Sequence, residues 1–172
     1  MKFLGTGSAL PKKVVSNDDL AQVMDTSDEW IRSRTGIGMR HIAVEETTTS
    51  MAVEAAEKAL ADAKISGCEI DLIIAGTISP DYIFPSLACE VQAAIGAKSA
   101  TAFDLSAACT GFVVAYNTAA AYLNAGVYQT ALIIGSESLS NLTNWKDRGT
   151  CILFGDGAGA AVLKSEDMRY YL

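Results

Sequence analysis

Residues 103–126, with the sequence FDLSAACTGFVVAYNTAAAYLNAG, contain a predicted strand end, a turn and a long apolar helix. We predict the strand over 100–104, the turn over 106–109 and the helix over 110–125. Apolar or small residues occur on every side of this helix, which is typical of a helix enclosed by protein. Polar side chains within it, such as Asn117, argue against a lipid-embedded span. The stretch therefore predicts a strand, a turn and a very apolar buried helix.

The flanking segments alternate between short strands and helices. Apolar runs at 70–75 and 130–134 predict strands, and helical periodicity predicts helices at 50–64 and 86–95. Such alternation implies crossover connections, so we expect an α/β fold with a mixed, largely parallel sheet and helices on both faces. The strand at 70–75 is apolar throughout, which favours a sheet covered on both faces.

The N-terminal part of the chain predicts shorter elements. We expect extended pieces at 2–6 and around Val14, followed by a helix through Met24 that Asn17 or Asp18 caps.

Two further predictions concern local sequence signals. A second helix start is predicted at Thr26, because Glu29 follows it at the spacing of a capping box. Residues 150–154 and 158–163 predict a hairpin. The glycine-rich run at 155–159 lacks the Lys-Ser/Thr of a phosphate-binding loop, so a tight turn is the better interpretation.

The composition describes one acidic domain rich in apolar residues. The chain has 172 residues and a formal net charge of −7, and 50% of its residues are hydrophobic. This balance excludes intrinsic disorder, and it disfavours nucleic-acid binding because that function needs a basic surface. No basic segment followed by a long apolar run occurs at the N-terminus. We therefore expect neither a signal peptide nor a membrane span, and a cytoplasmic location.

Cysteine and histidine usage argues against a metal site. The four cysteines show no CxxC pairing, and His41 is the only histidine. His41 is also far in sequence from Cys109. A structural or surface histidine is therefore favoured over a Cys–His dyad.

Cys109 differs from the other cysteines because it lies between a strand and a helix start, among small residues. Helix-terminal N–H groups and the helix dipole favour a thiolate there, and small neighbours let a substrate approach the sulfur. Free cysteines are also common as inert packing residues, so the pattern leaves a nucleophile and a packing residue both open. For Cys68, Cys89 and Cys151 we expect packing.

Trp30 lies beside Arg32, Arg34 and Thr35 near a predicted helix end. A tryptophan next to arginine can hold an aromatic base by stacking and cation–π attraction, and arginine can bind phosphate. A core tryptophan with solvated arginines fits the same pattern. The residues alone leave both interpretations open.

Six motifs occur in the order found in one enzyme family. They are DTSDEWI at 25–31, RTGI at 34–37, FPSLAC at 84–89, FDLSAACTGF at 103–112, DRGT at 147–150 and FGDGAGAA at 154–161. With these motifs the chain resembles, over essentially its whole length, β-ketoacyl-acyl-carrier-protein synthase III. That family comprises the condensing enzymes that start bacterial fatty acid synthesis.

The resemblance implies an acyltransferase with Cys109 as the acyl-accepting residue. Acetyl-coenzyme A, or another short acyl-coenzyme A, would acylate this cysteine. Malonyl-acyl-carrier protein would then be decarboxylated, and its carbanion would attack the acyl group. The coenzyme A thioester is a substrate, and no cofactor is implied.

The resemblance also implies five binding residues. By analogy with the family, Trp30, Arg34 and Arg148 hold the nucleotide part of coenzyme A, and Thr35 lies close to that ligand. Phe84 would reach across a dimer interface toward the partner's acyl pocket.

Family members are about twice as long, because the thiolase fold has two similar halves and the catalytic His and Asn lie in the second. We expect residues 1–172 to form the N-terminal thiolase-like domain, with the C-terminal half absent from this chain. Without the hydrogen bonds that His and Asn give to the developing enolate, condensation should fail.

Several alternatives remain for the chain by itself. It could be a non-catalytic domain that binds coenzyme A or acyl groups, or the N-terminal half of a related thiolase-superfamily condensing enzyme. A thioester hydrolase is disfavoured, because no suitable histidine is present. The apolar helix needs cover on both sides, so we expect a homodimer or association with a complementary half.

Overall fold

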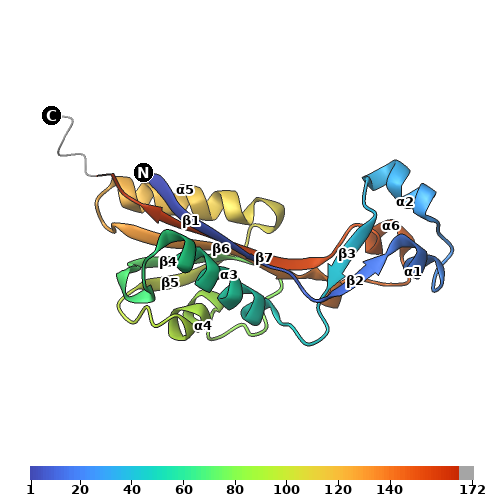
Figure 1. Cartoon of the computed structure of the whole chain (residues 1–172), viewed down its shortest axis with the longest axis horizontal. Helices are drawn as coiled ribbons and strands as arrows, with labels where there is room; N and C mark the ends of the chain where they lie inside the picture. Colours follow the sequence, from blue (N-terminus) through green and yellow to red (C-terminus); the bar gives the residue numbers. More distant parts are fainter. Residues whose placement is uncertain (167–172) are drawn as a thin grey trace.

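The computed structural model describes residues 1–166 and is built on a five-stranded sheet (Figure 1). The strands lie in the order β1-β7-β6-β4-β5. Their bounds are Lys2–Ala9 for β1, Leu72–Gly76 for β4, Thr101–Leu105 for β5, Thr130–Ser138 for β6 and Asp156–Lys164 for β7. β4 is parallel to β5 and β6, whereas β7 is antiparallel to β6 and β1. The sheet is therefore mixed, with a parallel core and an antiparallel edge.

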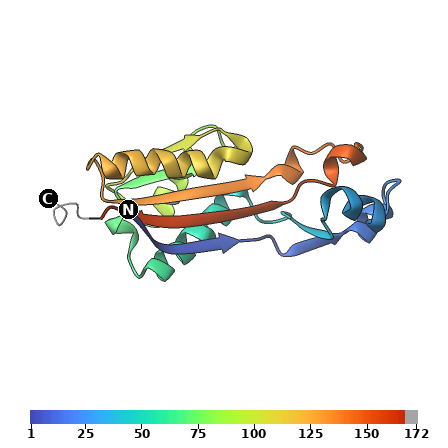
Figure 2. The same ribbon diagram turned by 90° about the horizontal axis from the view of Figure 1, so that it is seen from above.

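Helices cover both faces of this sheet (Figure 2). α3 (Thr48–Ala63) and α4 (Leu87–Ala94) pack on one face, and α5 (Gly111–Asn124) packs on the other. Alternate residues of the central strands point to opposite faces, so Ile73 joins the core under α3 and α4, while Ile74 joins the core under α5. This arrangement confirms the predicted α/β class and the fully apolar central strand.

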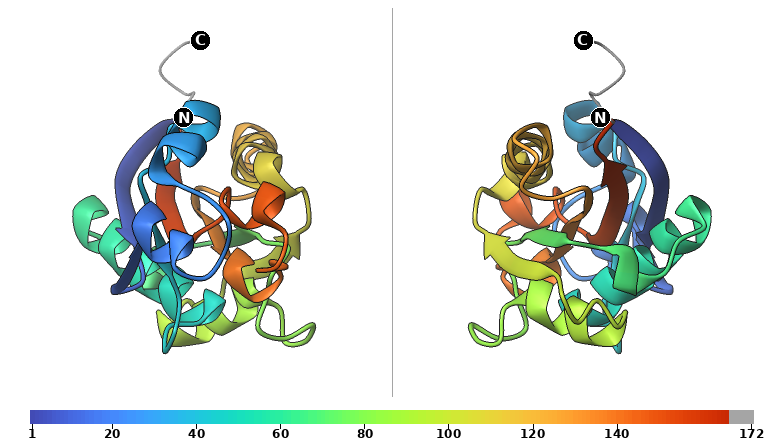
Figure 3. Two further views of the ribbon diagram at one scale, coloured as in Figure 1. Left: turned by 90° about the vertical axis from the view of Figure 1, so that its right-hand side faces the viewer. Right: turned by 90° about the vertical axis from the view of Figure 1, so that its left-hand side faces the viewer.

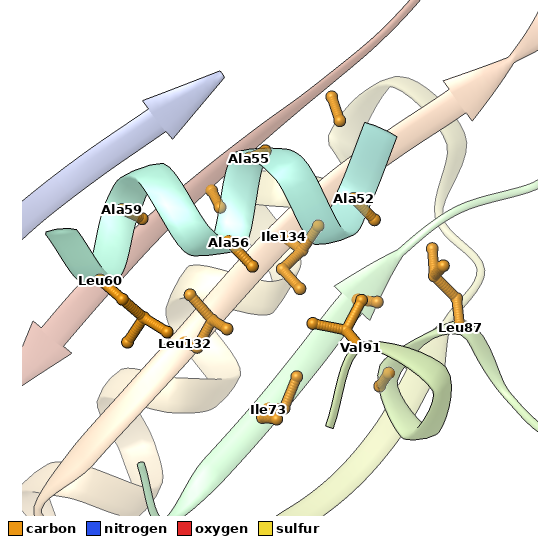
Figure 4. Close-up of a cluster of buried hydrophobic side chains, with 14 of the residues drawn as sticks. Ala52, Ala55, Ala56, Ala59, Leu60, Ile73, Leu87, Val91, Leu132 and Ile134 are labelled. Atoms are coloured by element: carbon orange, nitrogen blue, oxygen red, sulfur yellow. The ribbon is translucent and has the colours of Figure 1, made fainter. Parts of the chain in front are cut away.

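Small residues bring α3 into close contact with β1. The helix buries a stripe of alanines against the sheet: Ala52, Ala55, Ala56 and Ala59 (Figure 4). A Cβ atom on Gly5 would lie 2.3 Å from the Ala63 nitrogen, and one on Gly7 would lie 2.2 Å from the Ala55 oxygen. Glycine is required at both positions because the two backbones touch.

α5 buries only one of its faces within residues 1–166. Its buried residues recur every four positions and pack on the sheet: Gly111, Ala115, Ala119 and Leu123. Other positions of the helix expose large apolar side chains: Phe112, Val113, Val114 and Tyr122. The helix is thus as apolar as predicted, but the expected burial on all sides is not met by this chain alone. No helix in the described part of the chain is long and apolar enough to cross a membrane.

A small lobe lies beyond one end of the sheet (Figures 1 and 3). It contains a two-stranded antiparallel pair and three short helices: β2 (Lys13–Ser16), β3 (Met39–Ile42), α1 (Asn17–Ala21), α2 (Asp28–Thr35) and α6 (Arg148–Cys151). Leu20, Ile31, Cys151 and Ile152 form its own apolar core. The lobe therefore joins the N-terminal segment to residues far along the chain.

The predicted hairpin at 150–154 and 158–163 is wrong. Residues of the first segment lie in and after α6, whose N-cap Asp147 accepts a hydrogen bond from the Gly149 amide at 3.0 Å. The second segment lies in β7, which pairs with β6 and β1 instead. These partners are distant in sequence, so local turn signals could not identify them.

Two helix caps lie one or two residues from their predicted positions. Ser16, rather than Asn17 or Asp18, caps α1 with its side chain, and α1 ends at Ala21. Ser27, rather than Thr26, caps α2. Three short 3₁₀ helices complete the elements: η1 (Gly67–Glu69), η2 (Ala108–Thr110) and η3 (Leu139–Asn141).

Candidate active site

Cys109 lies in the turn that connects the parallel core of the sheet to α5. β5 ends at Leu105, and η2 carries Cys109 directly before the start of α5. The residue is exposed. The preceding Ala108 has a φ of 44°, in the left-handed region that is unfavourable for a residue with a Cβ atom. A strained turn thus presents Cys109 at the surface, ahead of the first turn of a helix.

Small residues surround this turn. A Cβ atom on Gly76, at the carboxyl end of β4, would lie 3.0 Å from the carbonyl carbon of Gly111. The start of α5 therefore rests directly on the end of a parallel strand, where α/β folds commonly bind ligands. The N-terminal end of α5 also faces the small lobe (Figure 2).

The other three cysteines have different surroundings. Cys68 is exposed, with its sulfur 3.0 Å from the Ser66 hydroxyl. Cys89 is half-buried in α4. Cys151 is buried in the small lobe, and desolvation, reinforced by the nearby Asp147 carboxylate, raises the pKa of its thiol. Cys151 therefore fits the expected packing role, whereas the packing expected for Cys68 is wrong because that residue is exposed.

Trp30, Arg34 and Arg148 form a cluster on the small lobe. The guanidinium carbon of Arg34 lies 4.3 Å from the Trp30 ring centroid, and that of Arg148 lies 4.8 Å from it. Trp30 and Arg34 are one helical turn apart on α2, whereas Arg148 comes from the first residue of α6. Both arginines are thus within cation–π distance of one half-buried indole ring.

Asp25 contacts Arg148 at this position, and no sequence pattern predicts this contact. Arg148 donates a hydrogen bond to the Asp25 backbone carbonyl, and its Nη1 lies 3.4 Å from the Asp25 carboxylate. Asp25 is in the segment before α2, so the contact joins the two helices that carry the cluster. Their sequence separation explains why spacing could not predict it.

Thr35 and Phe84 occupy different settings. The Thr35 hydroxyl donates to the Ile31 carbonyl at 2.8 Å and accepts from the Ile37 amide at 3.0 Å, so it shapes the end of α2 beside the cluster. Phe84 is 88% exposed in the connection between β4 and α4, outside the small lobe. The structure thus brings Trp30, Arg34, Arg148 and Thr35 into one lobe and leaves Phe84 apart.

His41 is engaged in a structural contact. Its Nδ1 lies 2.6 Å from the Pro11 carbonyl oxygen, and the ring is half-buried in β3. Within residues 1–166, no group of three or more His, Cys, Asp or Glu side chains is placed to hold a metal ion.

Comparison with known proteins identifies sequence relatives. The family described as 3-oxoacyl-[acyl-carrier-protein (ACP)] synthase III matches residues 103–171. The β-ketoacyl-[acyl-carrier-protein] synthase III of Clostridium acetobutylicum is 53% identical over 97% of this chain. That of Desulfitobacterium hafniense is 55% identical over 98% of the chain. In both comparisons the chain spans about half of the relative's length, 51%.

Solved structures show the same relation in three dimensions. The 3-oxoacyl-[acyl-carrier-protein] synthase III of Aquifex aeolicus superposes with a TM-score of 0.94 at 53% identity. The match covers 96% of this chain and 54% of that one. The priming β-ketosynthase of the R1128 polyketide pathway superposes with a TM-score of 0.93 at 39% identity, again over 50% of its length. Both confirm the thiolase-like fold that the sequence motifs implied.

Proposed function

We propose that this chain carries the nucleophile and the coenzyme A site of a condensing enzyme. It belongs to the β-ketoacyl-[acyl-carrier-protein] synthase III family and corresponds to the N-terminal half of its members. Cys109 would accept a short acyl group, and Trp30, Arg34 and Arg148 would bind the nucleotide end of acyl-coenzyme A. The observation that carries this proposal is the cluster itself. Two arginines from separate helices meet on one indole ring at the small lobe, toward which the start of α5 is directed.

The cluster suits a charged aromatic nucleotide. An adenine ring placed against Trp30 and a guanidinium group would be stacked by π contacts and cation–π attraction. The same guanidinium groups present planar N–H forks that match phosphate oxygens. Arg34 and Arg148 are both exposed, so neither charge has to be desolvated before the ligand arrives.

The first step is thioester exchange at Cys109. The thiolate sulfur attacks the acyl carbonyl carbon of acyl-coenzyme A and forms a new S–C bond. The bond between that carbon and the coenzyme A sulfur breaks, and coenzyme A leaves as a thiolate. The position before α5 directs helix N–H groups toward developing negative charge.

The second step requires groups beyond those in this chain. Malonyl-acyl-carrier protein loses CO₂, and the resulting carbanion attacks the acyl carbonyl and displaces the Cys109 thiolate. Hydrogen-bond donors must stabilise the intermediate enolate, and loss of one such donor typically costs about 10²–10³ in rate. We propose that a complementary C-terminal half supplies the His and Asn donors that the family resemblance implies.

The remaining expectations follow from the same assignment. Thr35 would border the bound coenzyme A at the end of α2. Phe84, on its exposed connection, would contact the acyl site of a partner subunit in a homodimer. The acyl-carrier protein would be the second substrate, no cofactor would be needed, and the reaction would take place in the cytoplasm.

Mass spectrometry tests the acyl-transfer step. We expect incubation with acetyl-coenzyme A to add about 42 Da, one acetyl group, to the peptide that contains Cys109. Hydroxylamine should remove the adduct, because it cleaves thioesters. Cys109→Ser should abolish the adduct, and Cys68→Ser should leave it unchanged, since Cys68 is the other exposed thiol.

Two results would contradict the proposal in different ways. Binding of coenzyme A without any adduct on Cys109 would favour a non-catalytic binding domain. An adduct distributed equally over Cys68 and Cys109 would indicate unassisted chemical acetylation of exposed thiols.

A further inference from the structure

A buried arginine connects the segments that carry the Trp30 cluster. Arg40, on β3, is 5% exposed. Its Nη1 donates to the Val15 carbonyl at 3.3 Å, and its Nη2 donates to the Asn17 side-chain oxygen at 2.8 Å and to the Ile152 carbonyl at 3.4 Å. Burial lowers its pKa, and the nearby Cys151 opposes that change. A charge this buried needs several acceptors to offset its desolvation.

The Asn17 side chain connects Arg40 to the Asp28 carboxylate by hydrogen bonds. The Asn17 side chain is fully buried, and its Nδ2 donates to Asp28 Oδ1 at 2.7 Å and to the Ile37 carbonyl at 2.7 Å. The amide thus turns its oxygen toward the Arg40 cation and its NH₂ group toward the Asp28 anion, which uses both ends of the amide. The hydrogen bond from Asn17 is the main reason that the pKa of Asp28 is lowered, followed by that from Arg32.

This network touches both helices of the cluster. Asp28 is the first residue of α2, two residues before Trp30. Ile152 is the C-cap of α6, whose first residue is Arg148. The Arg40 guanidinium is therefore connected to the N-terminus of α2 through Asn17 and directly to the C-cap of α6.

We propose that Arg40, acting through Asn17, is a positioning residue that holds Trp30 and Arg148 together for the binding of coenzyme A. The inference rests on the proposed function, and it assigns to Arg40 an indirect role. Arg40 makes its hydrogen bonds within the small lobe, whereas Cys109 lies in the turn before α5. Its replacement should therefore weaken binding and leave the reactivity of Cys109 unchanged.

The test uses Arg40→Lys and Asn17→Ala. Arg40→Lys keeps the positive charge but loses the planar guanidinium group that donates to three acceptors. Asn17→Ala keeps Arg40 but removes the amide that connects it to Asp28. Both are made in a Trp145→Phe background, so that Trp30 is the one remaining tryptophan of the two in the chain. We expect the calorimetric Kd for coenzyme A to rise by about tenfold, as for the loss of one good polar contact.

Two further readouts separate positioning from general stability. Acrylamide quenching of Trp30 without ligand should increase in both variants, whereas iodoacetamide labelling of Cys109 should keep its rate. Val91→Ala, at a buried position of α4, is the control. It should lower the melting temperature without changing the coenzyme A affinity or the Trp30 quenching.

Several results would overturn the inference. One is that Arg40→Lys and Asn17→Ala fold but keep the parental coenzyme A affinity and the parental quenching of Trp30. Another is that Val91→Ala loses as much coenzyme A affinity as these variants when their melting temperatures are matched. Unfolding of both Arg40→Lys and Asn17→Ala would assign Arg40 a purely structural role. Failure of the Trp145→Phe parent to bind coenzyme A would instead contradict the proposed function, and the quenching of Trp30 would still decide whether Arg40 positions it.

Discussion

Cys68 and Cys109 provide a matched pair of thiols for testing the nucleophile. Both are exposed, but only Cys109 lies immediately before a long helix, whose N–H groups and dipole can stabilise negative charge that develops on the reacting atoms. We expect iodoacetamide to label Cys109 faster than Cys68 near neutral pH, and faster than the buried Cys151. Peptide mapping over a time course measures these rates. Equal or slower labelling of Cys109 in the folded chain would show that its place before α5 does not activate it.

Trp30 carries the prediction for ligand affinity. Replacement by alanine removes the stacking surface, and base–aromatic stacking is worth roughly 1–3 kcal/mol. Titration calorimetry with coenzyme A should therefore show a loss of binding free energy in that range for Trp30→Ala. Trp145→Phe is the control, because Trp145 lies outside the cluster and phenylalanine keeps an aromatic ring at that position. An unchanged affinity in Trp30→Ala would contradict the assigned binding site.

Glu46 links the segment between β3 and α3, to which it belongs, with the segment between β1 and β2. Its carboxylate accepts hydrogen bonds from the Lys12 amide at 3.0 Å and the Val44 amide at 3.3 Å. These backbone hydrogen bonds, that from Lys12 first, lower the pKa of Glu46 to about 2 from 4.5. A lowered carboxyl pKa stabilises the fold above pH 4.5, and the contribution disappears as the pH falls toward 2.

Glu46→Gln should therefore lower the melting temperature at pH 7 and have little effect near pH 2. Thermal melts across this pH range measure the difference between the variant and the parent chain. The exposed neighbour Glu45 provides the control, and Glu45→Gln should show a smaller pH-dependent difference. A destabilisation by Glu46→Gln that is the same at both pH values would show that the carboxylate charge is not involved.

The elements that the sequence predicts well are those with a strong internal period. α3, α4, the central strand β4 and the edge strand β5 fall within two residues of their predicted bounds. β4 is a continuous apolar run, and the apolar residues of the other three recur at helical spacing or alternate. β6 continues four residues beyond the predicted end at 134, through Ser138, where it still pairs with β7. The predicted hairpin is wrong because β7 pairs with β6 and β1, and the tertiary fold determines this pairing.

The residues of the candidate site also differ in how far local sequence patterns predict their positions. The spacing of Trp30 and Arg34 places both on one helix face, and the position of Cys109 follows from a local strand–turn–helix pattern. Arg148 was connected to Trp30 only through the family motifs, because it reaches the ring across the small lobe. The roles of Asp25 and Arg40 depend on contacts between distant segments, and no local signal marks them.

For the molecule as a whole, α5 is a long apolar helix that the rest of residues 1–166 covers on one face only. Val113 is 58% exposed on this helix, which also exposes Phe112, Val114 and Tyr122. Large exposed apolar patches mark interaction sites in soluble proteins. We expect the 18.1 kDa chain to self-associate, or to gain stability when a complementary half covers this helix.

Light scattering and thermal melts over a concentration series measure this association. Val113→Lys should reduce the apparent mass, and Val23→Lys should not, because Val23 is exposed on the small lobe instead. A monodisperse monomer with a melting temperature independent of concentration, and no binding of an apolar dye, would show that α5 needs no cover.

Complementation between two half-chains tests whether this chain is the nucleophile-bearing half of a condensing enzyme. The chain is co-expressed with the C-terminal half of one of its relatives, and a one-to-one complex is verified by light scattering. Formation of acetoacetyl-acyl-carrier protein from acetyl-coenzyme A and malonyl-acyl-carrier protein is then measured. We predict product from the complex, none from either half alone, and none with Cys109→Ser. A one-to-one complex that forms no product, or one whose activity survives Cys109→Ser, would contradict the claim.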